Sequence, residues 1–188
     1  NQNSNLGKSD ILVCEADESD KSFLHLNPYT AVITNIDNDH LESYQNSIEY
    51  LIYHFYLFTE NLPFYGYAVL NIDNTNIRKL IKYINRPFLT FGFSKKADYV
   101  IENLKFLKGK PKFYIRKNNT NSIGSNIIVS LNTYGQHNIY NSVSAIIVSW
   151  LYKITNEKII DSLKNFSGVR RRFEFLGKFR VNKFNNIN

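Results

Sequence analysis

Two short apolar runs, each followed at once by a cluster of polar residues, constrain the fold of this chain more than any other feature. Residues 11–14 (Ile-Leu-Val-Cys) lead into Glu-Ala-Asp-Glu-Ser-Asp at 15–20, and residues 31–35 lead into Ile-Asp-Asn-Asp-His at 36–40. Short β-rich apolar runs are typical of strands buried on both faces in a parallel sheet. Open α/β sheets bind their ligands at the carboxyl ends of such strands. The pattern therefore predicts carboxylates and an imidazole at a ligand-binding edge of a sheet.

The segment between residues 47 and 93 alternates between helical and strand-like periodicity. Apolar residues at helical spacing predict a helix over 48–61, with Ser47 as its N-cap and Pro63 as its stop. A strand at 66–72, a helix at 74–85 and a strand at 88–93 are expected to follow. This rhythm is typical of βαβ units. We therefore expect an α/β fold, in which a mainly parallel sheet is flanked by helices.

After residue 98 the pattern changes to short strand-like runs with no helix between them. These runs cover residues 99–106, 112–116 and 127–131. They predict a small antiparallel sheet at residues 98–131. Two helices are expected next, over 138–153 and 157–166, and then Gly168 and an exposed edge strand at 173–176.

Composition places the chain among ordinary globular proteins and excludes several functional classes. Hydrophobic residues make up 43% and charged residues 21% of its 188 positions, which excludes a disordered chain. No window offers the roughly 18 apolar residues of a membrane span. The net charge of +7 comes from scattered lysines and one dense run, Arg170-Arg171-Arg172, so it suits phosphorylated small molecules better than nucleic acid.

The single cysteine indicates a reducing compartment. Cys14 has no partner for an internal disulfide, and its place in an apolar run predicts a buried, inert thiol. No signal peptide is present in the sequence. We therefore expect a cytoplasmic protein.

The polar cluster at residues 15–20 is a candidate metal-binding segment. Its four carboxylates repel one another and are readily held together by a cation, and Glu15 is nearest to the end of the predicted strand. His40 follows the next predicted strand beside Asp39, whose carboxylate can orient the imidazole ring. Hard oxygen ligands suit a divalent ion that carries phosphates. The alternatives are a solvated acidic loop and a structural histidine.

Two further motifs are candidates for contacts with a nucleotide. Gly135-Gln-His-Asn138 precedes a predicted helix that contains Asn141, and its amides and imidazole can hydrogen-bond a base; the alternative is a turn in which Asn138 is the N-cap. Residues 170–172 place three guanidinium groups in a short turn, where at least one can bind phosphate oxygens; the alternative is a solvated charge run. No complete Gly-x-x-x-x-Gly-Lys-Ser/Thr loop occurs, because Gly7-Lys8-Ser9 has only the tail of that pattern.

Taken in order along the chain, these motifs resemble a known family. They are Glu15-Ala-Asp-Glu-Ser-Asp-Lys-Ser-Phe-Leu-His-Leu26, Thr34-Asn35 with Asp39-His40, Asn61-Leu-Pro-Phe-Tyr-Gly66, Gly135-Gln-His-Asn138 with Asn141, and Arg171-Arg-Phe-Glu-Phe-Leu-Gly177. From about residue 7 to residue 178 the chain resembles the central, ATP-binding domain of the Mur ligases. Within that family it is most similar to the members that join L-alanine to UDP-N-acetylmuramate in peptidoglycan precursor synthesis.

The resemblance implies an ATP-dependent acyl transfer. The muramate carboxylate attacks the γ-phosphate of ATP to give an acyl-phosphate, and the amine of L-alanine then displaces phosphate. By the same resemblance, Glu15 and His40 each ligate a magnesium ion. The adenine is contacted by His137, Asn138 and Asn141, and the phosphates by Arg172 and Arg171. Glu15, His40 and Arg172 are the implied catalytic residues, and Asn35 is substrate-facing or supports the metal ligands.

The chain departs from the family in several places. The phosphate-binding loop of the family is expected upstream of Asn1. By our alignment, Ile52 stands where relatives carry a lysine that can be carbamylated to help hold metal. Residues 1–178 are interpreted as the central domain and residues 179–188 as the start of the C-terminal domain. Because the chain also contains no Met, we expect an internal fragment without ligase activity of its own, whose partners are the missing N- and C-terminal domains.

Two other functions remain open. One is the related ligase that recycles a murein tripeptide, although the unbroken Glu18-Ser19-Asp20 spacing argues against it. The other is a nucleotide- or metal-binding module without catalysis, which Ile52 favours.

Overall fold

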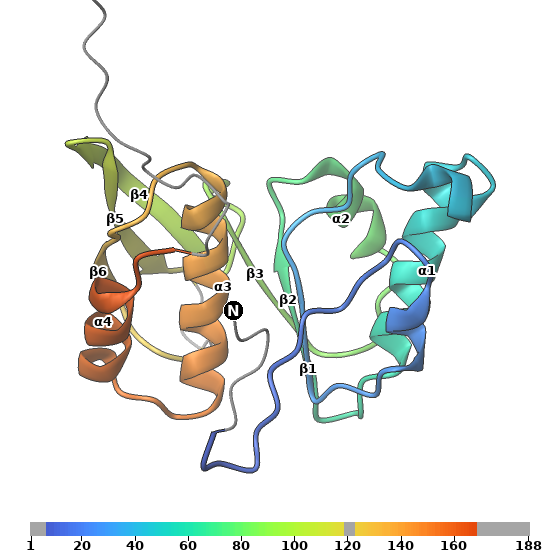
Figure 1. Ribbon diagram of the computed structural model, residues 1–188, viewed down its shortest axis with the longest axis horizontal. Helices are drawn as coiled ribbons and strands as arrows, with labels where there is room; N and C mark the ends of the chain where they lie inside the picture. The colour runs from blue at the N-terminus through green and yellow to red at the C-terminus, as the bar shows by residue number, and fades with distance from the viewer. Residues whose placement is uncertain (1–6, 119–122, 169–188) are drawn as a thin grey trace, which may run out of the picture. The chain divides into compact units, whose positions relative to one another are not determined.

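The computed structural model describes residues 7–118 and 123–168 and contains both helices and strands (Figure 1). In chain order its elements are η1 (Ser22–His25), β1 (Thr30–Ile33), η2 (Leu41–Tyr44), α1 (Ile48–Glu60), β2 (Tyr67–Asn71), α2 (Thr75–Leu80), β3 (Phe88–Gly92), β4 (Tyr99–Leu107), β5 (Lys110–Lys117), β6 (Ile127–Ser130), α3 (His137–Leu151) and α4 (Asn156–Asn165). The chain divides into two compact units, Asn1–Leu89 and Thr90–Asn188. The edge strand predicted at 173–176 lies outside the described residues.

Within the described residues, six strands form a mixed sheet in the order β1-β2-β3-β4-β5-β6. β1 pairs with β2 in parallel, with Val32 opposite Val69. β3 pairs with β4 in parallel, whereas β4, β5 and β6 pair with one another in antiparallel fashion. The predicted α/β fold is therefore confirmed.

The antiparallel strands differ from the prediction in one respect, because they continue the sheet instead of forming a separate one. Phe91 of β3 lies opposite Tyr99 of β4, so β4 starts beside the end of β3 and runs on in the same direction. A parallel pair normally needs a crossover of a dozen or more residues. This staggered start allows the short segment 93–98 to connect the two strands. The change of sequence pattern after residue 98 therefore corresponds to a change from parallel to antiparallel pairing within one sheet.

α1 begins and ends as predicted. The Ser47 side chain accepts a hydrogen bond from the Tyr50 N–H at 3.3 Å, which satisfies one of the donors left open at a helix start. One face of the helix buries Leu51, Ile52 and Phe58 in a hydrophobic core that also contains Phe23 and the strands β1 and β2. The aromatic rings of Phe23 and Phe58 lie 5.2 Å apart.

α2 is shorter than the predicted helix at 74–85. Asn74 is its N-cap, and the Asn74 side-chain oxygen accepts from the N–H groups of Asn76 and Ile77 at 3.0 Å. The helix ends at Leu80, where the N–H of Tyr83 already bonds to the carbonyl of Leu80 at 2.9 Å. This three-residue spacing tightens the chain into turns, which apolar periodicity does not distinguish from a continuing helix.

The strand predicted at residues 11–14 is wrong. Residues 11–18 adopt no regular secondary structure, and the side chains of Leu12 and Val13 are 86% and 87% exposed. Cys14 is exposed as well, so the expectation of a buried thiol is also wrong. An apolar run becomes a strand only where its N–H and C=O groups pair with a neighbour. In the part of the chain that the structure describes, β1 pairs with β2 alone, and residues 11–14 join no ladder.

In the second unit, the two helices α3 and α4 are joined through the single tryptophan. The indole N–H of Trp150 donates to the side-chain oxygen of Asn156 at 2.7 Å, and the Asn156 amide donates to the Ser125 hydroxyl at 2.7 Å. Trp150 also packs against Tyr99 of β4, with ring centroids 5.5 Å apart. No helix in the described ranges is long and apolar enough to cross a membrane.

Candidate functional site

The carboxyl ends of β1 and β2 are held together by asparagine side chains. The Asn71 amide donates to the Thr34 carbonyl at 3.0 Å, which ties the end of β2 to the end of β1. Asn74 and Asn76 both donate to the carbonyl of Ile36, at 3.4 and 2.9 Å. These amides fix the backbone that leads from β1 to His40. Their role could not be predicted from the sequence, because asparagines after a strand also occur in ordinary polar turns.

Asn35 belongs to this network. Its side-chain amide donates to the Asp37 carboxylate at 2.6 Å, and its side-chain oxygen accepts from the Thr34 hydroxyl at 3.1 Å. Asp37 also accepts from Asn74 at 3.2 Å. Asn35 therefore holds the start of the segment that carries His40.

Residues 15–20, which we call the acidic loop, form a series of tight turns. Asp17 accepts from the Ser19 N–H and Asp20 from the Ser22 N–H, both at 2.9 Å. Hydrogen bonds from Ser19, its side chain first and then its backbone, lower the pKa of Asp17, and hydrogen bonds from Ser22 lower that of Asp20. Both carboxylates are ionised at neutral pH, so the loop presents negative charge to solvent.

The structure brings the acidic loop beside the segment of residues 37–40, which we call the His40 turn. The Tyr44 hydroxyl donates to the Glu18 carbonyl, and the charge of His40 contributes, as the smallest cause, to the lowered pKa of Asp17. His40 has a left-handed backbone (φ 55°), and its Nδ1 lies 3.9 Å from the Glu42 carboxylate with half of the side chain exposed. Asp39, predicted to orient the ring, is exposed.

The donors do not form a ready-made cage for a metal ion. Within residues 7–118 and 123–168, no group of three or more His, Cys, Asp or Glu side chains is placed to hold a metal. Glu15 is exposed in the acidic loop. Ile52, aligned above with a metal-binding lysine, is 6% exposed and packs in the core of the first unit. Position 52 therefore contributes packing and no ligand.

The predicted adenine-contacting residues lie at the start of α3. Gly135 has φ +92°, and a Cβ there would lie 2.6 Å from the imidazole of His137, so the glycine makes room for that ring. Asn138 is not the N-cap, as the alternative reading proposed, because Gln136 holds that position. The Asn138 amide instead donates back to the Tyr134 carbonyl at 2.7 Å.

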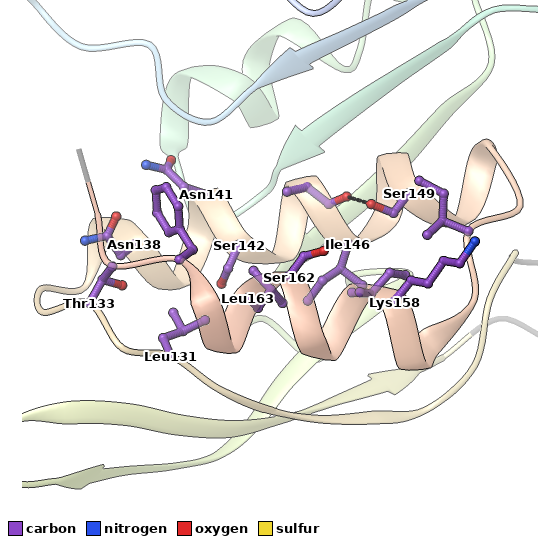
Figure 2. A pocket seen from close by; sticks show the side chains of 14 residues that line it. Leu131, Thr133, Asn138, Asn141, Ser142, Ile146, Ser149, Lys158, Ser162 and Leu163 are labelled. Carbon is purple, nitrogen blue, oxygen red and sulfur yellow. Dashed lines mark hydrogen bonds between the residues drawn. The ribbon is translucent and has the colours of Figure 1, made fainter. Parts of the chain in front are cut away.

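A pocket of about 390 Å³ lies between α3 and α4 (Figure 2). Asn138 and Asn141 lie at one end of it and Lys158 lies at the other. Its walls are mostly apolar and include Leu131, Ile146, Ile154, Ile159, Leu163 and Phe166. A concave, mostly apolar site with a few polar groups is typical of small-molecule binding. The arginines Arg171 and Arg172, predicted to face phosphates, lie outside the described residues.

Comparison with known proteins identifies the family. Residues 3–149 match the family described as Mur ligase middle domain. The chain belongs to that family. It is 42% identical over 183 residues to a UDP-N-acetylmuramate–L-alanine ligase of Buchnera aphidicola subsp. Baizongia pistaciae. This match covers 97% of the chain but 37% of the relative, so the chain spans little more than a third of that ligase.

Solved structures share the fold of this Mur ligase middle domain. A UDP-N-acetylmuramate–alanine ligase from Thermotoga maritima matches with a TM-score of 0.70 and 26% identity, over 86% of this chain and 34% of its own. A MurF ligase from the same organism, solved in complex with ADP, matches with a TM-score of 0.58 and 20% identity, over 76% of this chain and 31% of its own. The second likeness concerns the fold alone.

Proposed function

We propose that this chain supplies the middle domain of a cytoplasmic, ATP-dependent ligase that joins L-alanine to UDP-N-acetylmuramate. The observation that carries the proposal is the 42% identity, along 97% of the chain, to a relative named for that reaction. In the reaction, a muramate carboxylate oxygen attacks the γ-phosphorus, the bond to the ADP oxygen breaks, and an acyl-phosphate forms. The amine of L-alanine then attacks the acyl carbon and phosphate leaves.

The pocket between α3 and α4 supports the nucleotide part of the proposal. Asn138 and Asn141 place amide groups at one end, and an amide can both donate to and accept from the edge of a purine. The apolar walls suit the face of a flat base. In this proposal His137, which precedes Asn138 at the start of α3, also contacts the base, and Arg171 and Arg172, which lie outside the described residues, would bind the phosphates.

The donors at the acidic loop fit a magnesium ion that is bound together with phosphates. Mg²⁺ in phosphate-transfer sites usually takes one or two protein carboxylates and completes its octahedron with water and phosphate oxygens. Such an ion needs only one or two protein ligands from the acidic loop and the His40 turn. In the proposal Glu15 and His40 would hold the metal, with Asn35 fixing the start of the His40 turn. When bound, the metal would neutralise charge on the phosphates.

Thermal unfolding with ATP and Mg²⁺ tests the proposed nucleotide and metal site. We expect ATP with Mg²⁺ to raise the melting temperature of the protein, and Glu15→Ala to abolish most of that rise. Asp10→Ala is the matched control, because Asp10 is an exposed carboxylate shortly upstream of the acidic loop. An equal rise in Glu15→Ala and in the unmodified chain would refute the role of Glu15.

A nucleotide-binding module without catalysis is the second candidate. Ile52 favours it, because its side chain is buried in the core and cannot replace a metal-binding lysine. This candidate predicts the same stabilisation by ATP and no transfer of phosphate. Phosphate release that depends on L-alanine therefore separates the two functions.

A further inference from the structure

One buried side chain connects the two segments that carry the proposed metal ligands. Tyr44 is the last residue of η2, shortly after His40, and its side chain is 0% exposed. Its hydroxyl donates to the backbone carbonyl of Glu18 in the acidic loop. The hydrogen bonds from Ser19 to Asp17 and from Ser22 to Asp20 join near neighbours in sequence. Tyr44 therefore ties the loop to the His40 turn.

The ring of Tyr44 is held in place by its neighbours. His54 of α1 lies edge-on to it, with ring centroids 5.1 Å apart and an interplanar angle of 80°. The His54 ring is fixed in turn by a 2.8 Å hydrogen bond between Nδ1 and the Tyr50 carbonyl. Because the hydroxyl stands on a buried and packed ring, it presents a fixed donor to the loop.

Lys21 adds a second contact from the loop side. Its ammonium group lies 5.2 Å from the centre of the Tyr44 ring and 5.3 Å from that of Tyr50. These distances are typical of cation–π attraction. The Lys21 N–H also donates to the Glu18 carbonyl at 3.2 Å, so that oxygen accepts from both residues. The Glu18 carbonyl thus accepts one hydrogen bond from the backbone of Lys21 and one from the side chain of Tyr44.

We propose that Tyr44 and Lys21 form a clamp that positions the acidic loop beside the His40 turn. Both act as positioning residues, since they hold the loop backbone and are not themselves metal ligands. The clamp rests on the contacts above, whereas its consequence for the metal rests on the function proposed for Glu15 and His40. Without the clamp, the loop keeps its local turns but loses its attachment near His40.

Hydrogen exchange tests the clamp without reference to metal. Tyr44→Phe keeps the buried ring and removes the donor to Glu18. We expect the amides of residues 15–24 to exchange about two- to tenfold faster in this variant, the range that corresponds to one neutral hydrogen bond. Tyr53→Phe is the matched control, because Tyr53 also contacts His54 but is 51% exposed and lies within α1. It should leave the exchange of these amides unchanged.

A second variant tests the clamp in case Tyr44→Phe does not fold. Lys21→Gln removes the ammonium from the two rings and leaves the core untouched, and it should also speed exchange in residues 15–24. If Tyr44→Phe loses the native far-UV circular dichroism, Lys21→Gln decides the outcome. Unchanged exchange in the folded variants would overturn the clamp.

Manganese binding, followed by electron paramagnetic resonance, tests the consequence for the metal. We expect Tyr44→Phe to weaken the apparent Kd for Mn²⁺ by about two- to tenfold, and Tyr53→Phe to leave it unchanged. Glu15→Gln reports on the site itself. If the unmodified protein binds no Mn²⁺, or binds it independently of Glu15, the proposed metal site fails and the exchange data alone judge the clamp. Faster exchange with an unchanged Kd would overturn the positioning role.

Discussion

Ser47 shows how much a single side chain contributes at the start of α1. Its oxygen accepts from the Tyr50 N–H, a donor that the helix itself cannot satisfy. We expect Ser47→Ala to lower the free energy of unfolding by about 1 kcal/mol. Urea unfolding followed by far-UV circular dichroism measures the change.

Thr155, the N-cap of α4, provides the matched control for Ser47. Its side chain makes no capping hydrogen bond. Thr155→Ala should therefore cost less than about 0.5 kcal/mol, within the range of ordinary surface changes. Equal losses in the two variants would contradict the capping role of Ser47.

Tyr44 gives a pH dependence whose sign follows from its surroundings. Burial, and then the charges of Glu18, Asp20 and Asp17, raise its pKa from 10.0 to about 12. The folded protein thus holds the phenol proton more tightly than the unfolded chain. The resulting stability is fully present below pH 10 and is lost as the pH rises toward 12. The loss amounts to about 2–3 kcal/mol for a shift of this size.

Tyr44→Phe should remove this loss. We expect the stability difference between the unmodified protein and Tyr44→Phe to shrink steadily between pH 9.5 and 11.5 in urea unfolding. A constant difference for Tyr44→Phe would mean that the phenol is not buried as described.

At the level of single residues, the sequence predicts a role best where the role is local. Ser47 was identifiable as a cap because the motif and the helix it starts lie side by side in the chain. Tyr44 was not identifiable, because its partner, Glu18, lies far away in sequence. Asn138 shows a third case, since its amide bonds back to Tyr134 although its position suited an N-cap. An asparagine at this position can either cap the helix or bond back to a preceding carbonyl, and the residue type alone does not decide between the two.

Among whole elements, α3, α4 and the segment before β6 depend on one polar junction. Asn156 accepts from the Trp150 indole and donates to Ser125, so it contacts all three. Asn156→Ala leaves the indole N–H of a 5% exposed tryptophan without its partner. We expect a loss of about 1–3 kcal/mol, the cost of an unsatisfied buried donor.

The chain offers its own reporter for this junction, because Trp150 is its single tryptophan. Fluorescence during urea unfolding gives the stability, and a red shift of the native emission would indicate a more polar indole environment. Asn165→Ala is a suitable control, since the Asn165 side chain donates to Asp161 within the same helix at 3.2 Å. A similar loss in both variants would indicate general weakening of α4 and not the junction.

Elements were predictable where pattern and partner agree. α1 and β2 matched closely, because their apolar spacing is the spacing of the faces they bury. Residues 11–14 carry the same apolar signal as β1 but join no ladder among the described residues. Hydrophobicity indicates that a run can be buried, whereas strand formation also requires a neighbour to accept its backbone bonds. The sequence of the run does not show whether such a neighbouring strand is present.

At the scale of the whole molecule, local chemistry predicted where a ligand binds, whereas family resemblance predicted the family. Carboxylates after apolar runs and amides before a helix predicted where a phosphorylated ligand binds. They did not distinguish a ligase from another nucleotide-binding protein, because many reactions use the same groups. The order of several motifs along one chain predicted the family, and the match of residues 3–149 to the Mur ligase middle domain confirmed it.

A chimeric ligase tests whether this chain supports catalysis. Residues 7–168 would replace the aligned segment of the Buchnera ligase, which is 42% identical to this chain over 183 residues. We expect L-alanine-dependent release of phosphate from ATP in the presence of UDP-N-acetylmuramate. Glu15→Gln in the same chimera should lower kcat by about 100-fold or more, because even indirect support of a metal is commonly worth 10- to 100-fold. Asp10→Asn should leave kcat unchanged. A folded chimera that binds ATP but releases no phosphate would instead favour the non-catalytic module, in which the middle-domain fold keeps the nucleotide pocket and has lost the metal-dependent transfer.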